Sequence, residues 1–564
     1  MPVRKMTPFV LPVPVTADQP SLQDNTADLD RLRHALGLKL LAVDTAGGAL
    51  GVRPLEIPFA RIVPLCRRFR QAGFSGVALV NDLPDRWVLA DFLPQSPGRL
   101  PAMALDLGTT HLEATLVDLL TGQVLFSAGR ENSQIEYGAD ILSRIHQATS
   151  VRRQMREVVD LSFLDPGLAV LQQSIVACIN ALIVELASGS GVAAEDIRAL
   201  SVSGNTTMTH LLLGLDPFHI CREPYIPMVN VIEPMESREL GLILHEAAPV
   251  WIMPSAGSYF GGDLISGILA SGLAATEQTR MLIDVGTNAE VVLGNRDWLI
   301  ACAGAAGPAL EGGVARMGMR AAPGAIDFVS LDPETYALEV RTIGGAPARG
   351  LCGSGLIDLV ASLYLARIID IRGKFRDPDQ ESDPARAAFM RERLVERDGQ
   401  RAFVVVTAEA GDGDEVLLEQ IDLDAMIRSK AAMYAVLATL VGQVGLAFED
   451  LAEICVAGAF GNHINPQRAI TLGMLPDLDL SVYRAIGNSS LQGAEQVLFS
   501  RSARQECLDI VSKITYVELN VNQDFMIRFS GARFIPHTDP TLFPSVPLFA
   551  EQEEGAAESL KTKG

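Results

Sequence analysis

The stretch Met103-Ala-Leu-Asp-Leu-Gly-Thr-Thr-His-Leu-Glu decides the fold of this chain. An apolar run ends at Asp106, a glycine and two threonines follow at residues 108–110, and an alternating segment then leads to Thr121-Gly122. A short apolar run that is followed by a turn and an alternating segment is typical of a hairpin. The stretch therefore predicts a buried strand, a tight turn and a second strand that folds back on the first.

The same pattern returns much later in the chain, as Met281-Leu-Ile-Asp-Val-Gly-Thr-Asn-Ala-Glu. One such turn indicates little, but a matched pair indicates an α/β domain that is duplicated and faces itself across a cleft. The second copy repeats each position of the first, with Asp284, Gly286, Thr287 and Asn288 in the places of Asp106, Gly108, Thr109 and Thr110.

These turns have the chemistry of a phosphate site. Glycine lets backbone N–H groups approach a phosphate closely, neighbouring hydroxyls donate further hydrogen bonds, and a carboxylate at the end of a strand holds Mg²⁺ through water. Two facing turns are expected to clamp the β- and γ-phosphates of a nucleotide. The alternative is a pair of ordinary hairpin turns, in which Asp and Thr only cap backbone groups.

Composition and charge narrow the class of protein. The 564 residues carry a net charge of −22, which argues against a nucleic-acid partner. No run of 18 or more apolar residues occurs and the N-terminus lacks the apolar core of a signal peptide, so we expect no membrane span and a cytoplasmic location. The seven cysteines are scattered without a Cys-x-x-Cys pair, which predicts no iron–sulfur or zinc ligand set.

The domain organisation follows from linkers and periodicity. We predict an extended segment over 1–25, a small α/β domain over 26–98, a two-lobe domain over 99–545 and a disordered tail over 546–564. Within the small domain, a helix is expected to end at Gly37, followed by a strand over 38–43.

Two further motifs follow predicted strands. Asn205, Thr206 and Thr207 stand where a helix begins, so they are expected either to cap that helix or to place donors toward the cleft. The string Ala457-Gly-Ala-Phe-Gly predicts a turn narrow enough for a nucleoside to lie against its backbone. The order along the chain is therefore phosphate, phosphate, adenosine.

This ordered trio, with a hairpin after each Asp-x-Gly-Thr turn, resembles the ribonuclease H-like superfamily of actin, the sugar kinases and the ATPase part of heat-shock chaperones. Within it, the chain is similar to the reductive activators of corrinoid enzymes over about residues 99 to 540. The strings that carry this likeness are Asp106-Leu-Gly-Thr-Thr, Tyr137-Gly-Ala-Asp-Ile-Leu-Ser-Arg-Ile, Gly204-Asn-Thr-Thr-Met, Asp284-Val-Gly-Thr-Asn-Ala-Glu, Ala305-Ala-Gly-Pro-Ala-Leu-Glu-Gly, Gly350-Leu-Cys-Gly-Ser-Gly-Leu-Ile-Asp and Ala457-Gly-Ala-Phe-Gly.

The resemblance implies an ATP- and Mg²⁺-dependent ATPase that returns inactive Co(II) corrinoid to Co(I) for a methyltransferase system. Asp106 and Asp284 are expected to hold the metal, and Glu290 to orient the attacking water, unless Glu290 is only a solvated strand residue. The residues expected to bind the nucleotide are Gly108, Thr109, Thr110, Asn205, Gly286, Thr287, Asn288, Gly458, Ala459, Phe460 and Gly461.

One feature departs from the family. Its members typically carry an N-terminal ferredoxin-like domain with a [2Fe–2S] cluster, and this chain shows no such cysteine-rich loop. We therefore expect no iron–sulfur cluster in the chain and a separate, ferredoxin-like electron donor beside the corrinoid protein. The resemblance also suggests a homodimer. Two other functions stay open: a small-molecule kinase on the same fold, and an actin-like nucleotide-sensing module.

Overall fold

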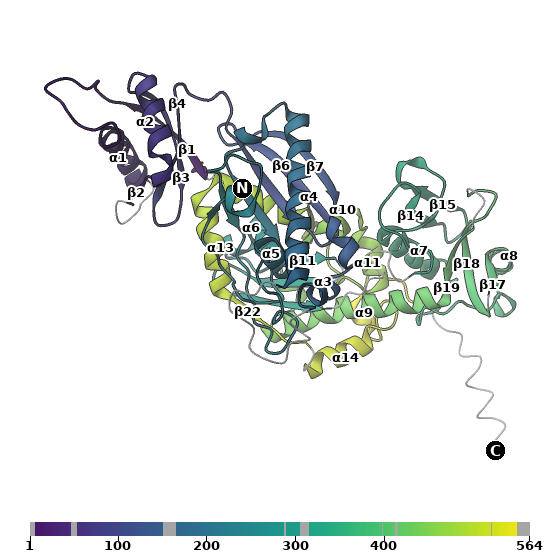
Figure 1. Ribbon diagram of the computed structural model, residues 1–564. Helices are drawn as coiled ribbons and strands as arrows, with labels where there is room; N and C mark the ends of the chain where they lie inside the picture. Colours follow the sequence, from purple (N-terminus) through teal and green to yellow (C-terminus); the bar gives the residue numbers. More distant parts are fainter. Residues whose placement is uncertain are drawn as a thin grey trace, which may run out of the picture. The chain divides into compact units, whose positions relative to one another are not determined.

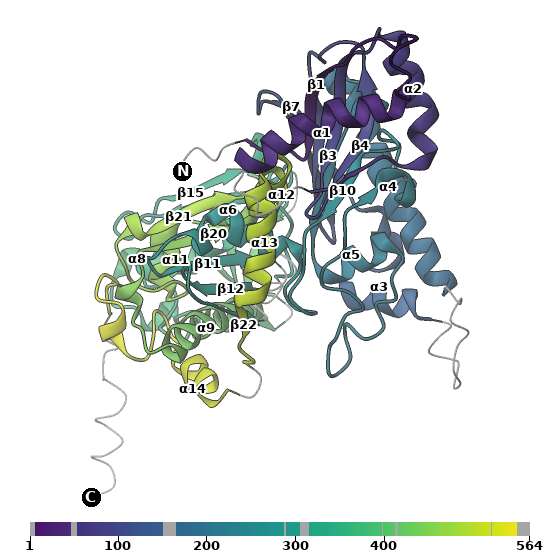
Figure 2. The same ribbon diagram turned by 90° about the vertical axis from the view of Figure 1, so that its left-hand side faces the viewer.

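The computed structural model describes residues 6–46, 53–150, 165–286, 289–304, 315–397, 399–411, 415–519 and 522–549. The chain forms two compact units, the first from residues 1–272 with 489–513 and the second from 273–488 with 514–564. The chain thus completes most of the second unit before it returns to the first. Figures 1 and 2 show the ribbon from two directions.

The first unit begins with a small α/β domain. Its four strands are ordered β1-β3-β4-β2, and two helices cover one face of this sheet (Figure 1). Phe69, Trp87 and Phe92 belong to the core of this domain. The N-terminal segment that was predicted to be extended belongs to this sheet, because its residues 10–16 form β1, which pairs antiparallel with β3. The elements are β1 Val10–Thr16, α1 Asp28–Ala46, β2 Leu55–Glu56, α2 Ile62–Gln71, β3 Ser75–Asp82 and β4 Trp87–Leu93.

The helix that was expected to end at Gly37 continues to Ala46, so the predicted strand over 38–43 is wrong. Leu32, Leu36 and Leu40 are buried at a spacing of one helical turn, which gives α1 one apolar face that runs past the glycine. A glycine inside a helix costs only about 1 kcal/mol relative to alanine. The buried face therefore outweighs the local stop signal.

The remainder of the first unit is a six-stranded sheet in the order β7-β6-β5-β8-β10-β9. Strands β5 and β8 are parallel, and β5, β6 and β7 form an antiparallel meander. Helices α4 and α12 both pack on this sheet, α4 against β6 and β7 and α12 against β5 and β8. The elements are β5 Pro101–Leu107, β6 His111–Asp118, β7 Val124–Glu131, α3 Ile141–Ala148, α4 Pro166–Ser190, β8 Leu200–Gly204, α5 Thr206–Leu213, β9 Met235–Glu236, β10 Pro249–Ile252, α6 Gly262–Ser271, α12 Ser489–Phe499 and α13 Arg501–Lys513.

The second unit repeats this sheet. Its order is β21-β20-β11-β12-β13-β22, in which β11, β12 and β13 form the antiparallel meander and β20 lies parallel beside β11. The predicted duplication of an α/β lobe is therefore confirmed in the strand order. The elements of this sheet and its helices are β11 Arg280–Val285, β12 Ala289–Gly294, β13 Leu299–Gly304, α7 Gly353–Leu365, α9 Gln420–Gln443, β20 Glu453–Ala457, α10 Gly458–His463, α11 Pro466–Leu472, β21 Tyr483–Gly487, β22 Ile514–Tyr516 and α14 Gln523–Gly531.

Two small three-stranded sheets complete the second unit, with the orders β15-β14-β16 and β17-β18-β19. The charged stretch over residues 384–397 contributes α8 and β17 to this region. These elements are β14 Ala325–Leu331, β15 Leu338–Thr342, β16 Gly350–Leu351, α8 Pro384–Arg393, β17 Leu394–Arg397, β18 Gln400–Val406 and β19 Val416–Glu419.

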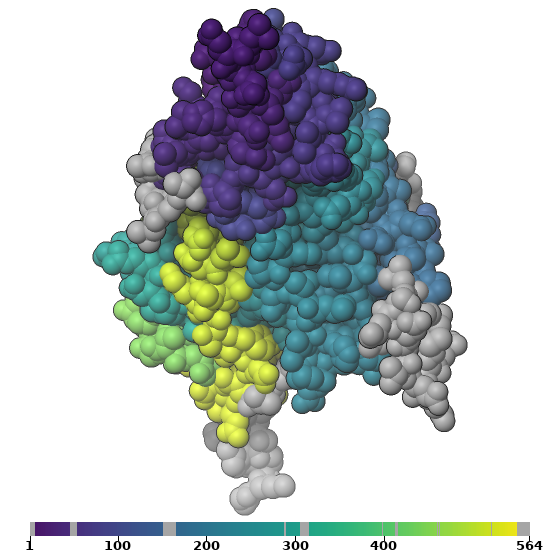
Figure 3. Space-filling model, turned by 60° about the vertical axis from the view of Figure 1, so that its left-hand side comes forward, coloured from purple at the N-terminus to yellow at the C-terminus, as the bar shows by residue number. Residues whose placement is uncertain are grey.

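The small domain is tied to the remainder of the first unit by ion pairs. Asp82 at the end of β3 is 2% exposed and lies 2.9 Å from Arg501 and 2.8 Å from Arg504, both on α13. Burial lowers the pKa of Arg504 to about 10. In Figure 3 the small domain, in purple, lies against the yellow segment that includes α13. The predicted boundary at residue 98 therefore separates two parts of one compact unit.

Two helices of the described chain are long and apolar enough in composition to cross a membrane, α4 and α9. The apolar window of α9 is 83% buried and that of α4 is 44% buried. Both helices contribute side chains to the hydrophobic cores of their units, Leu171 and Ile175 from α4 and Met433 and Leu437 from α9. These contacts explain their apolar composition.

Candidate functional site

In the first unit, Asp106 stands one residue before the end of β5. It pairs across the sheet with Glu113 on β6 and lies beside Ser203 on β8. Side chains alternate along a strand, and Met103, Leu105 and Leu107 join the core that includes α4. Asp106 is therefore on the opposite face of β5, where α12 packs.

The turn after Asp106 is tight. A side chain at Gly108 would collide with the backbone oxygen of His111, so only glycine fits here. The buried Asn132 holds the turn from the far end of the hairpin: its Nδ2 donates to the Gly108 carbonyl at 2.9 Å, and its backbone N–H donates to the Thr110 carbonyl at 2.8 Å. The turn is thus held at two of its carbonyl groups by one buried residue.

Asn205 has the capping role, one of the two alternatives that the sequence left open, and it also bonds the turn after β5. Its Oδ1 accepts from the backbone N–H of Met208 at 2.9 Å, which caps α5. Its Nδ2 donates to the hydroxyl of Thr109 at 3.0 Å, which joins the helix cap to the turn after β5. Thr206 instead donates to the carbonyl of Gly257 at 2.9 Å. The cap therefore also orients a hydroxyl of the predicted phosphate turn.

A residue that the sequence analysis did not select contacts Asp106. The hydroxyl of Ser490, in the first turn of α12, donates to Asp106 Oδ1 at 2.6 Å. The only local signal for it is the polar pair Ser489-Ser490 after a strand, because 384 residues separate Ser490 from the carboxylate that it contacts. Asn132 was also missed, although it lies in the segment that follows the first hairpin.

In the second unit, Asp284 occupies the matching position on β11. It pairs across the sheet with the half-buried Glu290 on β12 and lies beside Ala457 on β20. Gly458 begins α10 with φ +77°, and a Cβ there would lie 3.4 Å from Asp284 Oδ1. Burial, together with the nearby charge of Glu290, raises the pKa of the Cys302 thiol to about 12. Asp284, Glu290 and Gly458 thus lie together at the end of one sheet.

Part of the predicted site falls outside the described residues. Thr287 and Asn288 lie outside them, and so does the string Ala305-Ala-Gly-Pro-Ala-Leu-Glu-Gly. The string from Ala457 to Gly461 was expected to be a turn, and this is wrong, since residues 458–463 form the short helix α10. A side chain at Gly461 would collide with the carbonyl of Val456, so the helix follows the strand without a loop. Ala459 and Phe460 contribute their backbone to α10.

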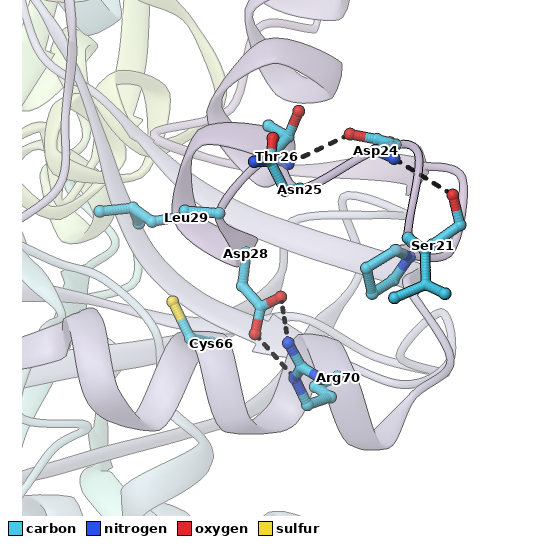
Figure 4. Close-up of a pocket in the computed structure, with 11 residues that line it drawn as sticks. Ser21, Asp24, Asn25, Thr26, Asp28, Leu29, Cys66 and Arg70 are labelled. Carbon is cyan, nitrogen blue, oxygen red and sulfur yellow. Dashed lines mark hydrogen bonds and ion pairs between the residues drawn. The ribbon is translucent and has the colours of Figure 1, made fainter.

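A surface pocket of about 780 Å³ lies away from these carboxylates, in the small domain (Figure 4). Arg70, which lines this pocket, already forms an ion pair with Asp28 at 2.7 Å. Leu22 on its rim is fully exposed, and burial raises the pKa of the Cys66 thiol at its floor. The pocket is open and its charges are neutralised, so it is not a candidate for the nucleotide site.

Among the described residues, no group of three or more His, Cys, Asp or Glu side chains is arranged to hold a metal ion. None of the seven cysteines forms a disulfide within the same residues. Burial raises the pKa of the Cys455 thiol to about 12, as for Cys302, which suits a packing role. The strand-end carboxylates Asp106 and Asp284 stay the predicted metal ligands.

The two halves of the chain match two known protein regions. Residues 101–276 match the family description "RACo middle region", and residues 278–547 match "C-terminal domain of RACo the ASKHA domain". A solved structure titled "Reductive activator for corrinoid,iron-sulfur protein" is 37% identical with a TM-score of 0.82, covering 97% of this chain and 82% of that chain.

Two curated relatives have names that agree with these matches. The "Corrinoid activation enzyme RamQ" of Eubacterium limosum is 31% identical over 442 residues, which are 78% of this chain and 71% of the relative. The "[Co(II) methylated amine-specific corrinoid protein] reductase" of Methanosarcina barkeri is 23% identical over 446 residues, 73% of this chain and 72% of the relative. The predicted fold, with an actin-like lobe in each half, is confirmed by the family match and the solved structure.

Proposed function

The chain belongs to the family of reductive activators of corrinoid proteins, and we propose that it returns Co(II) in the corrinoid of a partner protein to Co(I) in an ATP-dependent reaction. The observation that carries the ATP dependence is the matched pair of strand-end carboxylates. Asp106 and Asp284 stand at the same position in two sheets that share the order of five strands, β7-β6-β5-β8-β10 and β13-β12-β11-β20-β21.

The described residues suit Mg·ATP. Carboxylates are the hard oxygen donors that Mg²⁺ prefers, either directly or through water. No side chain fits at Gly108, where a Cβ would collide with the backbone oxygen of His111, and Gly458 has no side chain beside Asp284. We propose that Asp106 and Asp284 hold the metal, with Thr109, Thr110 and the two glycine turns on the phosphates. Bound Mg²⁺ would neutralise phosphate charge as the terminal phosphate leaves.

Glu290 is the proposed group that orients the attacking water. It lies opposite Asp284 in the register and is half-buried, so its carboxylate has fewer water contacts than a fully exposed one. A carboxylate that accepts a hydrogen bond from water places one lone pair of that water toward the phosphate. The products are ADP and phosphate, and the water proton passes to the carboxylate or to phosphate.

ATP supplies free energy but no electron. Reduction of one Co(II) to Co(I) takes one electron, so a low-potential one-electron donor must be oxidised in the same event. We propose a separate, ferredoxin-like protein as this donor. Binding of ATP would favour a docked state of activator and corrinoid protein in which the cobalt is easier to reduce, since a ligand shifts an equilibrium by its differential affinity. A homodimeric state and a cytoplasmic location stay predictions.

The test is an absorbance assay for Co(I) in a corrinoid methyltransferase partner held as Co(II). We expect Co(I) when the protein, Mg·ATP and a low-potential donor are all present. Omitting ATP or replacing it with ADP should leave Co(II), and so should omitting the donor. Formation of Co(I) with ATP but no donor would contradict the proposed donor, as would stoichiometric iron and acid-labile sulfide in the anaerobically purified protein.

The same assay separates the other functions. Turnover of ATP that is stimulated by a sugar or a small acid, and not by the corrinoid protein, would favour a kinase. Filaments that sediment only with ATP would favour an actin-like module. Absence of Co(I) with every component present would overturn the proposed function.

A further inference from the structure

Three serine hydroxyls form a continuous hydrogen-bonded chain behind Asp106. Ser266 on α6 lies 2.8 Å from Ser203 on β8, and Ser203 lies 2.8 Å from Ser490 on α12. Ser490 in turn donates to Asp106 Oδ1 at 2.6 Å. Ser266 and Ser203 are fully buried and Ser490 is 7% exposed. The chain joins three separate elements of the first unit to one carboxylate.

The direction of donation in this chain is fixed. Each hydroxyl has a single hydrogen, and an ionised carboxylate only accepts. Because Ser490 donates to Asp106, it must accept from Ser203, and Ser203 must in turn accept from Ser266. Hydrogen bonds aligned head to tail polarise one another, most of all where water is excluded. The chain therefore strengthens the final, charge-assisted bond to Asp106.

The backbone places Ser490 firmly. Gly493 brings α12 so close to α6 that a Cβ at this position would lie 2.5 Å from the Ser266 Cα. On β8, Leu200 and Val202 point to the core that includes α4, whereas Ser201 and Ser203 alternate to the face where α12 packs. Ser201 donates to the Ala494 carbonyl of α12 at 2.6 Å, which anchors the helix independently of Asp106.

A second hydroxyl stands beside Ser490 at the start of α12. Ser489 is 1% exposed, and its Oγ has no hydrogen-bond partner among the residues that the structure describes. Buried polar atoms in folded proteins are nearly always bonded to protein or to ordered water. This hydroxyl is therefore suited to bind an ordered water molecule at the start of α12.

We propose that Ser490 is a positioning residue for the hydrated Mg²⁺ of the nucleotide, acting through Asp106. This inference rests on the proposed Mg·ATP function. The hydroxyl chain holds one oxygen of Asp106 in place, so the carboxylate meets the metal without first losing freedom of rotation. Within the part of the chain that the structure describes, the Ser490 hydroxyl bonds Asp106 and Ser203, so its effect on the nucleotide passes through the carboxylate and the metal.

The test compares Ser490→Ala with Ser201→Ala. Each variant removes one buried hydroxyl that bonds α12 to a strand: Ser490 bonds Asp106 of β5, and Ser201 of β8 bonds the Ala494 carbonyl. Only Ser490→Ala removes a donor to Asp106. For Ser490→Ala we expect the Mg²⁺ concentration that gives half-maximal ATP turnover to rise about tenfold, the scale of a lost charge-assisted hydrogen bond. Ser201→Ala should keep the wild-type Mg²⁺ requirement.

Calorimetry of ATP binding provides a readout that does not depend on turnover. We expect the gain in ATP affinity on adding Mg²⁺ to shrink about tenfold in Ser490→Ala, whereas affinity in EDTA stays as in the wild type. Ser203→Ala, which breaks the chain one step earlier, should show a smaller change of about threefold. This second variant keeps the test decisive if Ser490→Ala does not fold.

The outcomes separate the two claims. A wild-type protein that binds no ATP with Mg²⁺ would overturn both the proposed function and this inference. A wild-type protein that binds Mg·ATP while Ser490→Ala and Ser203→Ala match it would overturn the inference alone. Equal losses in Ser490→Ala and Ser201→Ala would assign the serines a packing role, which also overturns it.

Discussion

In the first unit Asp106 lies beside Ser203 of β8, whereas in the second Asp284 lies beside Ala457 of β20. Five strands have the same order in both sheets, and β8 and β20 occupy the same place in it, so this difference comes from the residue on the neighbouring strand. After β8 the chain passes through Asn205, whose side chain caps a helix and bonds Thr109. After β20 it passes directly into Gly458, which has no side chain to fill the space.

The two copies of the duplicated lobe therefore surround their strand-end aspartates with different groups. Hydroxyl and amide groups around Asp106 fix a carboxylate and a turn, which suits a metal and phosphates. Gly458 beside Asp284 carries no side chain, which suits the close approach of a flat nucleoside to its backbone. Both aspartates keep their proposed role at the metal, and we propose that the second unit adds the nucleoside contact through Gly458.

The largest effect is expected from the carboxylates themselves. Asp106→Ala and Asp284→Ala should each lower ATP turnover about tenfold or more, because each removes a charge that is proposed to hold Mg²⁺. Steady-state ATPase rates at saturating Mg²⁺ measure this, with melting curves to show that both variants fold. Unchanged turnover in both would contradict the assignment, and loss in only one would place the metal in that unit.

Glu290 and Glu113 allow a matched test of the two hairpins, since each stands opposite a strand-end aspartate. Glu290→Gln should slow hydrolysis about tenfold while ATP affinity is kept, because the shape remains and only the charge is lost. Glu113 is exposed, and Glu113→Gln should leave the rate within about twofold. Similar effects of the two variants, or a parallel loss of binding in Glu290→Gln, would assign Glu290 to the strand and not to the water.

A smaller effect is expected at Gly458. A methyl group there would lie 3.4 Å from Asp284 Oδ1 and would occupy the proposed nucleoside surface. Gly458→Ala should weaken ATP binding several-fold, as measured by calorimetry. Gly445→Ala is the control, because Gly445 also has a positive φ, +69°, but a Cβ there meets nothing within 4 Å. Both variants carry about 1 kcal/mol of backbone strain, so equal affinities would remove Gly458 from the site.

The smallest expected effect is on thermal stability. Ionisation of a buried aspartate is expected to destabilise the fold at Asp358 in the second unit and to stabilise it at Asp91 in the first. Burial raises the pKa of Asp358 in α7 to about 6, above the ordinary value of 3.8. In the folded protein this carboxyl holds its proton more tightly, so its ionisation destabilises the second unit as the pH rises from about 4 to about 6. Asp358→Asn should therefore raise the melting temperature at pH 7 and have little effect at pH 4, which thermal scans at both pH values would show.

Asp91 in the first unit gives the opposite prediction. Burial opposes its ionisation, but hydrogen bonds from His245 and Arg198 outweigh this and hold the pKa of the carboxyl well below its usual range. Its stabilising contribution is complete above about pH 5 and is lost as the pH falls toward the lowered pKa. Asp91→Asn should lower the melting temperature at pH 7, and the difference should narrow in acid. A stabilising effect at pH 7 would contradict this sign.

Local patterns in the sequence determined the strand, turn and hairpin around Asp106 and their repetition around Asp284. These features depend on residues that are neighbours in the chain, such as an apolar run, a glycine that must approach His111, and alternation in the following strand. The seven strings that resemble the activator family follow from the same local order. The family could therefore be identified before the fold was known.

Only the tertiary structure decided what surrounds the carboxylates. Ser490 is 384 residues from Asp106 in sequence, and no local pattern brings the two together. The continuation of α1 through Gly37 likewise depends on a core that the leucines of α1 share with β1 and β4. Local propensity is worth about 1 kcal/mol at such a residue, whereas each buried leucine contributes about 1.5–3 kcal/mol, so tertiary packing overrides it.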